Sequence, residues 1–285
     1  MIRRHLLPMT SLVLILPFAG AARGDTSSAP VPDKSGCTLA NPVPEGQLRE
    51  LTTDRPDVTE SPFTIDAGHV QFEMDFANCA WDRLDGVRTT EWGVVPVNVR
   101  VGVRNNFEAG IFAAPYIHRT RQPRGGPKQT AAGFGDITLR GKWNFLGNDG
   151  GGKAFGLIAD LKLPTAADGL GNGKVEGDVA LPVLLEAGEW EVAMMTEGDA
   201  RWSDEHGDYR PAWLNTLSVG HKLFGSLDGY VELTSDTGDG PQVMTADAGI
   251  TWLLDRNTQL DAGANLGVSR TAPDVQVFSG LSRRF

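Results

Sequence analysis

The sequence has no uninterrupted apolar run of about 18 residues, and this absence excludes a membrane protein built from several spanning helices. Basic residues are also scarce, because 26 Lys and Arg against 36 Asp and Glu give a formal net charge of -10. This balance disfavours a general nucleic-acid-binding protein, which needs a basic surface. The motifs GxSxG and HExxH and a paired-carboxylate motif are missing, so no pattern indicates a hydrolase.

Cysteine is rare as well, with only Cys37 and Cys79 in the chain. The two form no CxxC motif and no Cys/His cluster, so we expect neither a metal site nor a cofactor. In an oxidising compartment an even pair could close a disulfide. Spacing alone does not distinguish a bond between Cys37 and Cys79 from two unpaired thiols.

Glycine and proline, by contrast, are abundant. The 35 Gly are about 12% of the 285 residues against a usual ~7%, and there are 17 Pro. This composition argues against long helices and for many short strands joined by turns. The averages, 40% hydrophobic residues and a mean hydropathy of -0.21, are those of an ordinary soluble domain, but a membrane β-barrel would give similar values.

Residues 1–22 have the three parts of a secretory signal peptide. Residues 3–5 are basic, residues 6–18 are apolar, and residues 19–21 are small. The apolar stretch is too short to favour an anchored N-terminal helix, and no cysteine stands at the cleavage point to carry a lipid. We therefore expect export, with a mature chain that begins near Ala22.

The rest of the chain divides into a lead-in and a long region of alternating residues. Residues 23–50 are rich in Pro, Ser, Gly and Asn and are predicted to be flexible or extended. Within residues 51–285 a period of two begins near residue 69, where Val70 and Phe72 fall on one face of a strand and polar residues on the other. The pattern recurs to the last residue and predicts about twelve strands of roughly 8 to 13 residues each.

Alternation alone fits a soluble β-sandwich as well as a barrel. Short turns, however, alternate with longer polar connections as they do in outer-membrane barrels, and the polar strand faces carry full charges of both signs, as the wall of a wet lumen does. The longer connections are predicted at residues 119–132, 164–175, 203–211, 235–241 and 270–273. The candidate lumen-facing residues are Glu73, Arg100, Glu108, Arg140, Lys142, Asp160, Lys162, Glu191, Asp247 and Asp261.

Aromatic residues near the predicted strand ends could form interfacial girdles, as they do in membrane proteins. They are Trp92, Phe107, Trp143, Phe145, Trp190, Trp213, Phe224 and Trp252. The chain also ends on Phe285, which resembles the terminal aromatic signal read by the barrel-assembly machinery, although Arg283 stands where that signal usually has an apolar residue.

These features together predict an all-β fold, a closed, antiparallel, up-and-down transmembrane barrel of about 12 strands. Such a barrel would lie among the lipids of a Gram-negative outer membrane. A periplasmic or secreted β-sandwich is the alternative.

Several segments resemble a known family. The opening TDRPDVTESP, followed by GHVQFE, resembles the start of a large bacterial family of outer-membrane proteins labelled "putative MetA-pathway of phenol degradation". The resemblance covers roughly residues 51–285. It implies an outer-membrane barrel that passes small compounds, aromatic or hydrophobic ones among them, and it defines no catalytic residues. The matching segments are TDRPDVTESP at 53–62, NNFEAGIFAAPY at 105–116, GFGD at 133–136, KLPT at 162–165 and GLSRRF at 280–285.

The TDRPD motif contains Asp54, Arg55, Pro56 and Asp57, and its proline excludes a regular helix or a central strand. One hypothesis places this segment in the lumen or at its periplasmic mouth, where Arg55 pairs with an inward carboxylate and sets the polarity of the pore. The other, which we favour, makes it a periplasmic-side plug or turn that only fixes the N-terminus.

The GFGD motif is predicted to be structural. Gly133 and Gly135 permit a bend at the start of a strand, and Asp136 can cap the turn. The inward acids and bases leave two alternatives open. They either form a field across an open lumen or pair with one another and partly fill it.

The predicted function is passive admission or binding of a small-molecule solute, because nothing in the sequence resembles a plug domain or an energy-coupling motif. A structural or adhesive surface barrel, whose long loops bind a partner, is the alternative from another class. An outer-membrane hydrolase is less favoured, since the histidines are scattered, and we expect no enzyme. The acidic residues 199–208 are predicted to form a solvated loop rather than a calcium site.

Overall fold

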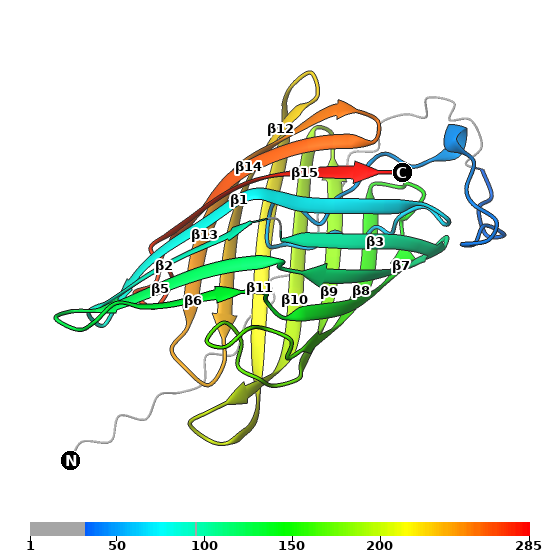
Figure 1. Ribbon diagram of the computed structural model, residues 1–285. Coiled ribbons are helices and arrows are strands. Elements are labelled where there is room, and N and C mark those ends of the chain that lie inside the picture. Colours follow the sequence, from blue (N-terminus) through cyan, green and yellow to red (C-terminus); the bar gives the residue numbers. More distant parts are fainter. Residues whose placement is uncertain (1–31, 95) are drawn as a thin grey trace, which may run out of the picture. The chain divides into compact units, whose positions relative to one another are not determined.

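The computed structural model describes residues 32–94 and 96–285, in which one antiparallel sheet closes into a barrel (Figure 1). Pairing of β15 with β1 closes the sheet and excludes the sandwich alternative. The strands are β1 (Val70–Leu84), β2 (Val87–Val94), β3 (Val97–Arg104), β4 (Phe107–Ala113), β5 (Tyr116–Pro123), β6 (Gln129–Gly133), β7 (Ile137–Leu146), β8 (Lys153–Leu163), β9 (Glu176–Ala187), β10 (Trp190–Ser203), β11 (Asp208–Phe224), β12 (Leu227–Thr237), β13 (Val243–Asp255), β14 (Thr258–Gly267) and β15 (Val275–Arg284).

These fifteen strands make twelve wall strands, because three wall strands are interrupted. β1 pairs with β3 along its first part and with β2 along its last part, so β2 and β3 are consecutive pieces of one wall strand. The same break separates β4 from β5 and β6 from β7. Pro96 and Pro115 lie in two of the breaks and have no N–H to give to a ladder. The predicted closed, up-and-down barrel of about 12 strands is confirmed.

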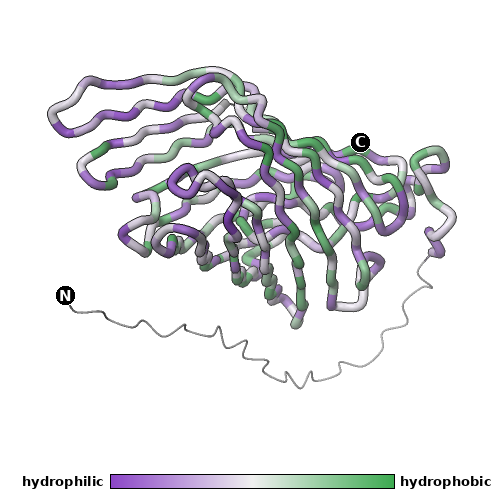
Figure 2. The backbone as a smooth tube through the Cα atoms, turned by 90° about the horizontal axis from the view of Figure 1, so that it is seen from below, coloured by the Kyte–Doolittle hydropathy of each residue, from purple (hydrophilic) through white to green (hydrophobic). Residues whose placement is uncertain are grey.

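The two faces of each wall strand differ as the period of two predicts, and apolar and polar residues alternate along the strands in Figure 2. In β1, Phe72 is 41% exposed on the outer face, whereas Glu73 and Asp75 are almost completely buried on the inner face. The largest fully buried side chains in the described residues include Arg100 and Lys142. The interior of this barrel is therefore a polar core, and its apolar surface faces outward.

The eight predicted girdle aromatics lie near the ends of the wall strands. All except Phe107 are exposed, and Phe107 stacks on Trp143 with ring centroids 4.6 Å apart. Six of them lie beside the short turns at one end of the barrel, and Trp92 and Trp213 lie toward the other end. Exposed indole and phenyl rings at strand ends suit the membrane–water interfaces.

Two predicted long connections are wrong. Residues 119–132 form most of the β5–β6 hairpin, and residues 203–211 contain only a four-residue turn, 204–207, between the long strands β10 and β11. β12 likewise extends to Thr237, inside a predicted connection. Strands that continue beyond the membrane are wet on both faces, so they lack the apolar face by which a strand is recognised.

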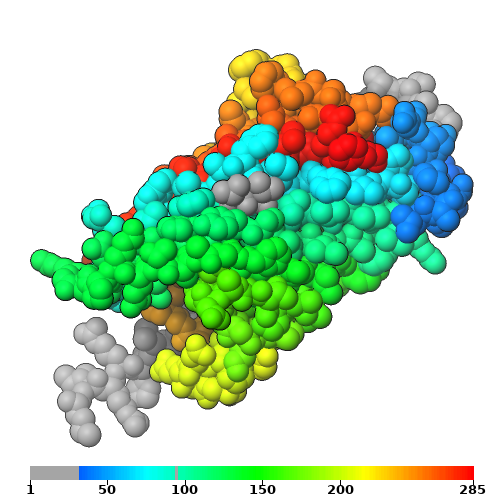
Figure 3. Space-filling model, viewed as in Figure 1, coloured from blue at the N-terminus to red at the C-terminus, as the bar shows by residue number. Residues whose placement is uncertain are grey.

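Residues 32–50 lie at the short-turn end of the barrel, beside the C-terminus (Figure 3). They form turns at 35–36 and 39–40 and one 3-10 turn, Glu45–Gln47. The Leu39 amide donates to the Val103 carbonyl at 2.9 Å, and the His69 ring bonds the Val43 carbonyl at 2.8 Å and the Phe285 carbonyl at 3.0 Å.

The predicted signal peptide, residues 1–22, lies outside the described residues. Within the part of the chain that the structure describes, no helix is long and apolar enough to cross a membrane.

Candidate functional site

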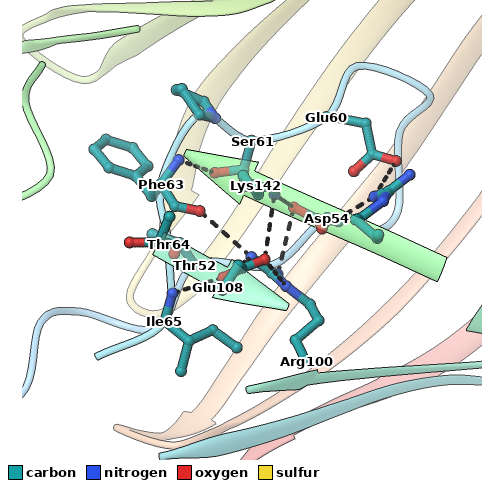
Figure 4. Close-up of polar contacts among 12 residues, drawn as sticks. Thr52, Asp54, Glu60, Ser61, Phe63, Thr64, Ile65, Arg100, Glu108 and Lys142 are labelled. Carbon is teal, nitrogen blue, oxygen red and sulfur yellow. Dashed lines mark hydrogen bonds and ion pairs between the residues drawn. The ribbon is translucent and has the colours of Figure 1, made fainter. Parts of the chain in front are cut away.

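Residues 51–67, which we call the lumen segment, pass through the interior of the barrel (Figure 4). The segment has neither helix nor strand, as Pro56 and Pro62 require. Its backbone groups therefore need partners on the wall, and inward polar side chains supply them. The Val58 and Thr59 amides donate to Glu232 at 2.8 and 2.7 Å, and the Ile65 amide donates to Glu108 at 2.7 Å.

Asp54 is the centre of the ion pairs that hold the lumen segment. Its carboxylate contacts Lys142 directly and lies 3.3 Å from Arg100 and 3.4 Å from Arg140. Its side chain is only 4% exposed, and Arg100 and Lys142 are completely buried. Burial opposes ionisation, but the three cations outweigh it and hold the pKa of Asp54 well below the usual carboxyl range.

The three cations are also shared with wall carboxylates. Arg100 on β3 lies 2.5 Å from Glu73 and 2.8 Å from Glu108. Arg140 on β7 lies 2.7 Å from Asp160 and 2.7 Å from Glu60 of the lumen segment. Each positive charge on this side of the lumen is thus neutralised in place, in a network that joins β1, β3, β4, β7 and β8 to the lumen segment.

Arg55 points to another part of the wall. Its guanidinium pairs with Asp261 on β14 at 2.7 Å and contacts Asp75 on β1 directly. Between these strands, on β15, Gly280 leaves room for the guanidinium, because a side chain there would collide with the Arg55 Nη2 atom. This arrangement corresponds to the hypothesis that the TDRPD motif lies in the lumen, where Arg55 pairs with inward carboxylates.

A cavity of about 740 Å³ lies between the lumen segment and β9–β14 at the short-turn end. Pro56 and Asp57 line it from the segment, and Glu186, Glu191 and Ser218 line it from the wall. A second cavity of about 330 Å³ lies at the opposite end, next to Arg201, Asp236 and Asp239.

An apolar cluster separates the two cavities along β10 and β11. Met195 on β10 lies between Ala193, which lines the first cavity, and Arg201, which lines the second. Met195 packs with Ile158, Ala180 and Leu214, and it is 4% exposed. The inward surface between the two cavities is therefore partly apolar.

The structure places the ten candidate lumen residues in four different environments. Seven belong to the ion-pair network around Asp54 and Arg55, and Glu191 lines the larger cavity. Lys162 pairs with Glu176 at 2.6 Å, near the loop of residues 164–175, and Asp247 is buried on β13. The seven network members are Glu73, Arg100, Glu108, Arg140, Lys142, Asp160 and Asp261.

The candidates from the sequence omit several inward wall carboxylates, Asp75 and Glu232 among them, and a second buried cluster. Asp75 and Glu232 are in phase with inward residues of their strands, so the same alternation that selected Glu73 could have found them. Asp66 lies 3.0 Å from Lys34 and 3.6 Å from Arg284 at the short-turn end. No sequence pattern signals that cluster, because its members come from both ends of the described chain.

The GFGD motif marks the break between β6 and β7. The Asp136 carboxylate accepts from the Ala166 amide at 2.9 Å, and the Phe134 carbonyl accepts from the Ala167 amide at 2.8 Å. Gly135 is needed because a Cβ there would lie 2.9 Å from Ile117. Asp136 thus caps the 164–175 loop, and Gly133, at φ +152°, ends β6.

The terminal Phe285 and the two cysteines occupy separate places. Phe285 exchanges backbone hydrogen bonds with Val70 at the start of β1 and packs edge-on against Phe72, with ring centroids 5.8 Å apart. It is 63% exposed.

Cys37 and Cys79 are both free thiols in the structure, so the disulfide that their even number allowed is not formed.

Two groups of potential metal ligands occur in the described residues. Asp178, Glu197 and Asp199 lie in the lumen, and Glu205, His206 and Asp239 are exposed at the loop end. Within the second group, the His206 Nδ1 atom lies 2.8 Å from Asp239 and 3.2 Å from Ser203. Both neighbours contact the same ring nitrogen, so this arrangement lacks the relay geometry of a serine hydrolase.

Comparisons with known proteins agree with this architecture. A family model described as "putative MetA-pathway of phenol degradation" matches residues 53–285. The fold is similar to that of the COG4313 outer membrane channel from Pseudomonas putida F1, with 11% identity, a TM-score of 0.60, and coverage of 82% of this chain and 100% of that chain. It is also similar to the beta domain of the Bordetella autotransporter Brka, with 13% identity, a TM-score of 0.51, and coverage of 76% and 99%. No curated protein matches the sequence.

Proposed function

We propose that this chain, which belongs to the family described as "putative MetA-pathway of phenol degradation", is an outer-membrane channel that admits small molecules passively. The observation that carries the proposal is the cavity of about 740 Å³ inside the closed wall. Its volume falls in the range of small-molecule sites, about 300 to 1,000 Å³. A purely structural barrel has no need to keep such a space beside a segment that already occupies the lumen.

The lining of this cavity favours small solutes with an apolar part. Leu51, Phe63, Leu184 and Leu253 contribute apolar surface, and the Asp57 carboxylate lies among them. A small aromatic or hydrophobic compound could contact the apolar side chains while its polar group remains hydrated or bonded. We take compounds of this kind as the solute class.

Passage through the lumen requires the lumen segment to move. The Met195 cluster lies on the wall between the two cavities, and the ion pairs of Asp54 and Arg55 fix the segment inside the barrel. Displacement of the segment would join the cavities without breaking the hydrogen bonds of the wall. The segment therefore serves as the gate of the channel in this proposal.

Planar-bilayer recording of the purified full-length protein tests the proposal. Discrete conductance steps from protein that shows heat-modifiable migration on a gel would support a channel. A folded protein that stays silent, and whose loading into liposomes does not speed the entry of a small neutral aromatic compound, would overturn it and favour the structural or adhesive barrel.

A further inference from the structure

The charges of the lumen are divided between two sides. Arg100 on β3 and Arg140 and Lys142 on β7 face the lumen segment, and all three pair with carboxylates at 3.4 Å or less. This side leaves no positive charge available to a solute. The carboxylates that neutralise the cations are likewise occupied.

The opposite side, from β9 to β13, carries carboxylates that face one another. Direct cross-strand neighbours are Glu186 with Glu191, Asp178 with Asp199, and Glu232 with Asp247. We call these six residues the acidic wall. Among the described residues, only Asp199 of the six forms an ion pair, with Arg201 at 3.1 Å.

Cations on the same strands do not compensate the acidic wall. Arg201 is divided between Asp199 and Asp236, at 3.1 and 2.7 Å. Lys222 and Arg256 line the larger cavity, but carboxylates outside the acidic wall, Asp228 among them, line it as well, and the carboxylates outnumber the cations there. The free side of the lumen therefore carries an excess of negative charge.

This arrangement has no evident benefit for folding. Like charges directly opposite each other on neighbouring strands destabilise a sheet. Asp247 is only 4% exposed, yet one of its carboxylate oxygens, Oδ1, is buried without a hydrogen-bond partner in the described residues. Buried polar atoms of this kind are normally satisfied, so this unpartnered acceptor inside the barrel is not explained by folding.

We infer that the acidic wall makes the channel selective for neutral and cationic solutes and repels anions, carboxylates in particular. The inference rests on the proposed channel function and deepens it. A lumen lined by one sign of charge and surrounded by a low-dielectric wall concentrates counter-ions and excludes co-ions. An acidic wall would thus admit a neutral phenol or an amine and hold back the corresponding carboxylate.

Reversal potentials of the full-length protein in a KCl gradient test this inference. The dilute side should hold about 0.1 M KCl, where the Debye length of about 10 Å leaves the lumen charges only partly screened. K⁺ should permeate in preference to Cl⁻, so the reversal potential should have the sign set by K⁺. The double variant Glu186→Gln/Glu191→Gln should bring the permeability ratio of K⁺ to Cl⁻ toward unity, because it removes the two charges of the acidic wall that line the larger cavity.

A matched control variant removes two carboxylate charges outside the lumen. Glu205→Gln/Asp208→Asn lies at the exposed tip of the β10–β11 hairpin, and it should leave the reversal potential unchanged. A conducting protein with no preference or with a preference for Cl⁻ would overturn the acidic-wall inference and leave the channel proposal standing. A silent, folded protein would instead remove the channel proposal itself.

Discussion

Replacing Asp54 by Asn should release the lumen segment without unfolding the barrel. Asp54 is the carboxylate that contacts Lys142 directly, and the next acid, Glu108, lies 3.9 Å away and is already paired with Arg100. The substitution is nearly isosteric, so it removes charge and leaves the volume unchanged. Lys142, which has no exposed surface, would then be buried without a close ionic partner.

The expected cost follows from that loss. Removing one partner of a buried ion pair typically costs about 3 to 5 kcal/mol, because the remaining charge stays desolvated. At about 1.4 kcal/mol for each factor of ten, the docked state of the segment would lose roughly two to four orders of magnitude in population relative to the released state. The wall keeps its hydrogen-bonded ladders, so this cost falls on the docking of the segment.

Two measurements should detect the release. Single-channel recording of Asp54→Asn should show larger or longer openings than the parent protein. A cysteine introduced by Ser61→Cys, with Cys37 and Cys79 replaced by serine, should react faster with a water-soluble maleimide when Asp54→Asn is added. Heat-modifiable migration should be unchanged, as evidence that the barrel remains folded.

The double variant Asp54→Asn/Lys142→Met supplies the control. It removes both members of the pair, and replacing a whole buried pair by uncharged groups is often neutral. Arg100 keeps Glu73 and Glu108, so docking should return close to that of the parent. Unchanged conductance and unchanged maleimide reactivity in Asp54→Asn would refute the role of this ion pair in holding the segment.

Three further predictions concern other parts of the molecule. Arg55→Ala should raise the single-channel conductance as Asp54→Asn does, because it removes the pairs that hold the segment to Asp261 and Asp75. Although partial burial opposes it, the hydrogen bond from Arg49 lowers the pKa of Asp149 below its ordinary 3.8. Because its pKa is lowered in the folded state, the Asp149 carboxylate stabilises the docked residues 32–50 at pH values above 3.8. This stabilisation is lost as the pH falls from 3.8 through the folded-state pKa. Hydrogen exchange of residues 32–50 should therefore accelerate over that pH range more in the parent protein than in Asp149→Asn. Phe285→Ala should lower the yield of heat-modifiable protein in the outer membrane, and a normal yield would argue against recognition of the terminal ring by the assembly machinery.

Local alternation sufficed to predict the barrel and the inward direction of its charged residues. Glu73 and Arg100 follow from the phase of their own strands, because a period of two assigns each side chain to a face. The ion-pair partners of these residues did not follow from the phase of the strands. Asp54 meets Lys142 across 88 residues of sequence, and that contact depends on the closure of the sheet and on the path of a segment with no periodicity.

The apolar part of the interior did not follow from the period of two. Met195 occupies an inward position of β10, but its cluster depends on Ile158, Ala180 and Leu214, which reach it from three other strands. For a related reason, the sequence alone could not decide between a filled and an open lumen. Both alternatives describe part of the interior, since the cations of β3 and β7 are paired and the acidic wall is not.

The irregular path of the lumen segment lets two neighbouring charges reach different parts of the wall. The segment bends at Asp54 and again at residues 56–59, and Asp54 reaches Lys142 on β7 while Arg55 reaches Asp261 on β14. A helix would place consecutive side chains about 100° apart, and its diameter of about 10 Å with side chains would take up the space of the cavity. Pro56 prevents that helix at the point where the segment crosses the lumen. The same residue thus keeps the two charges on opposite walls and keeps the space beside them free for a solute.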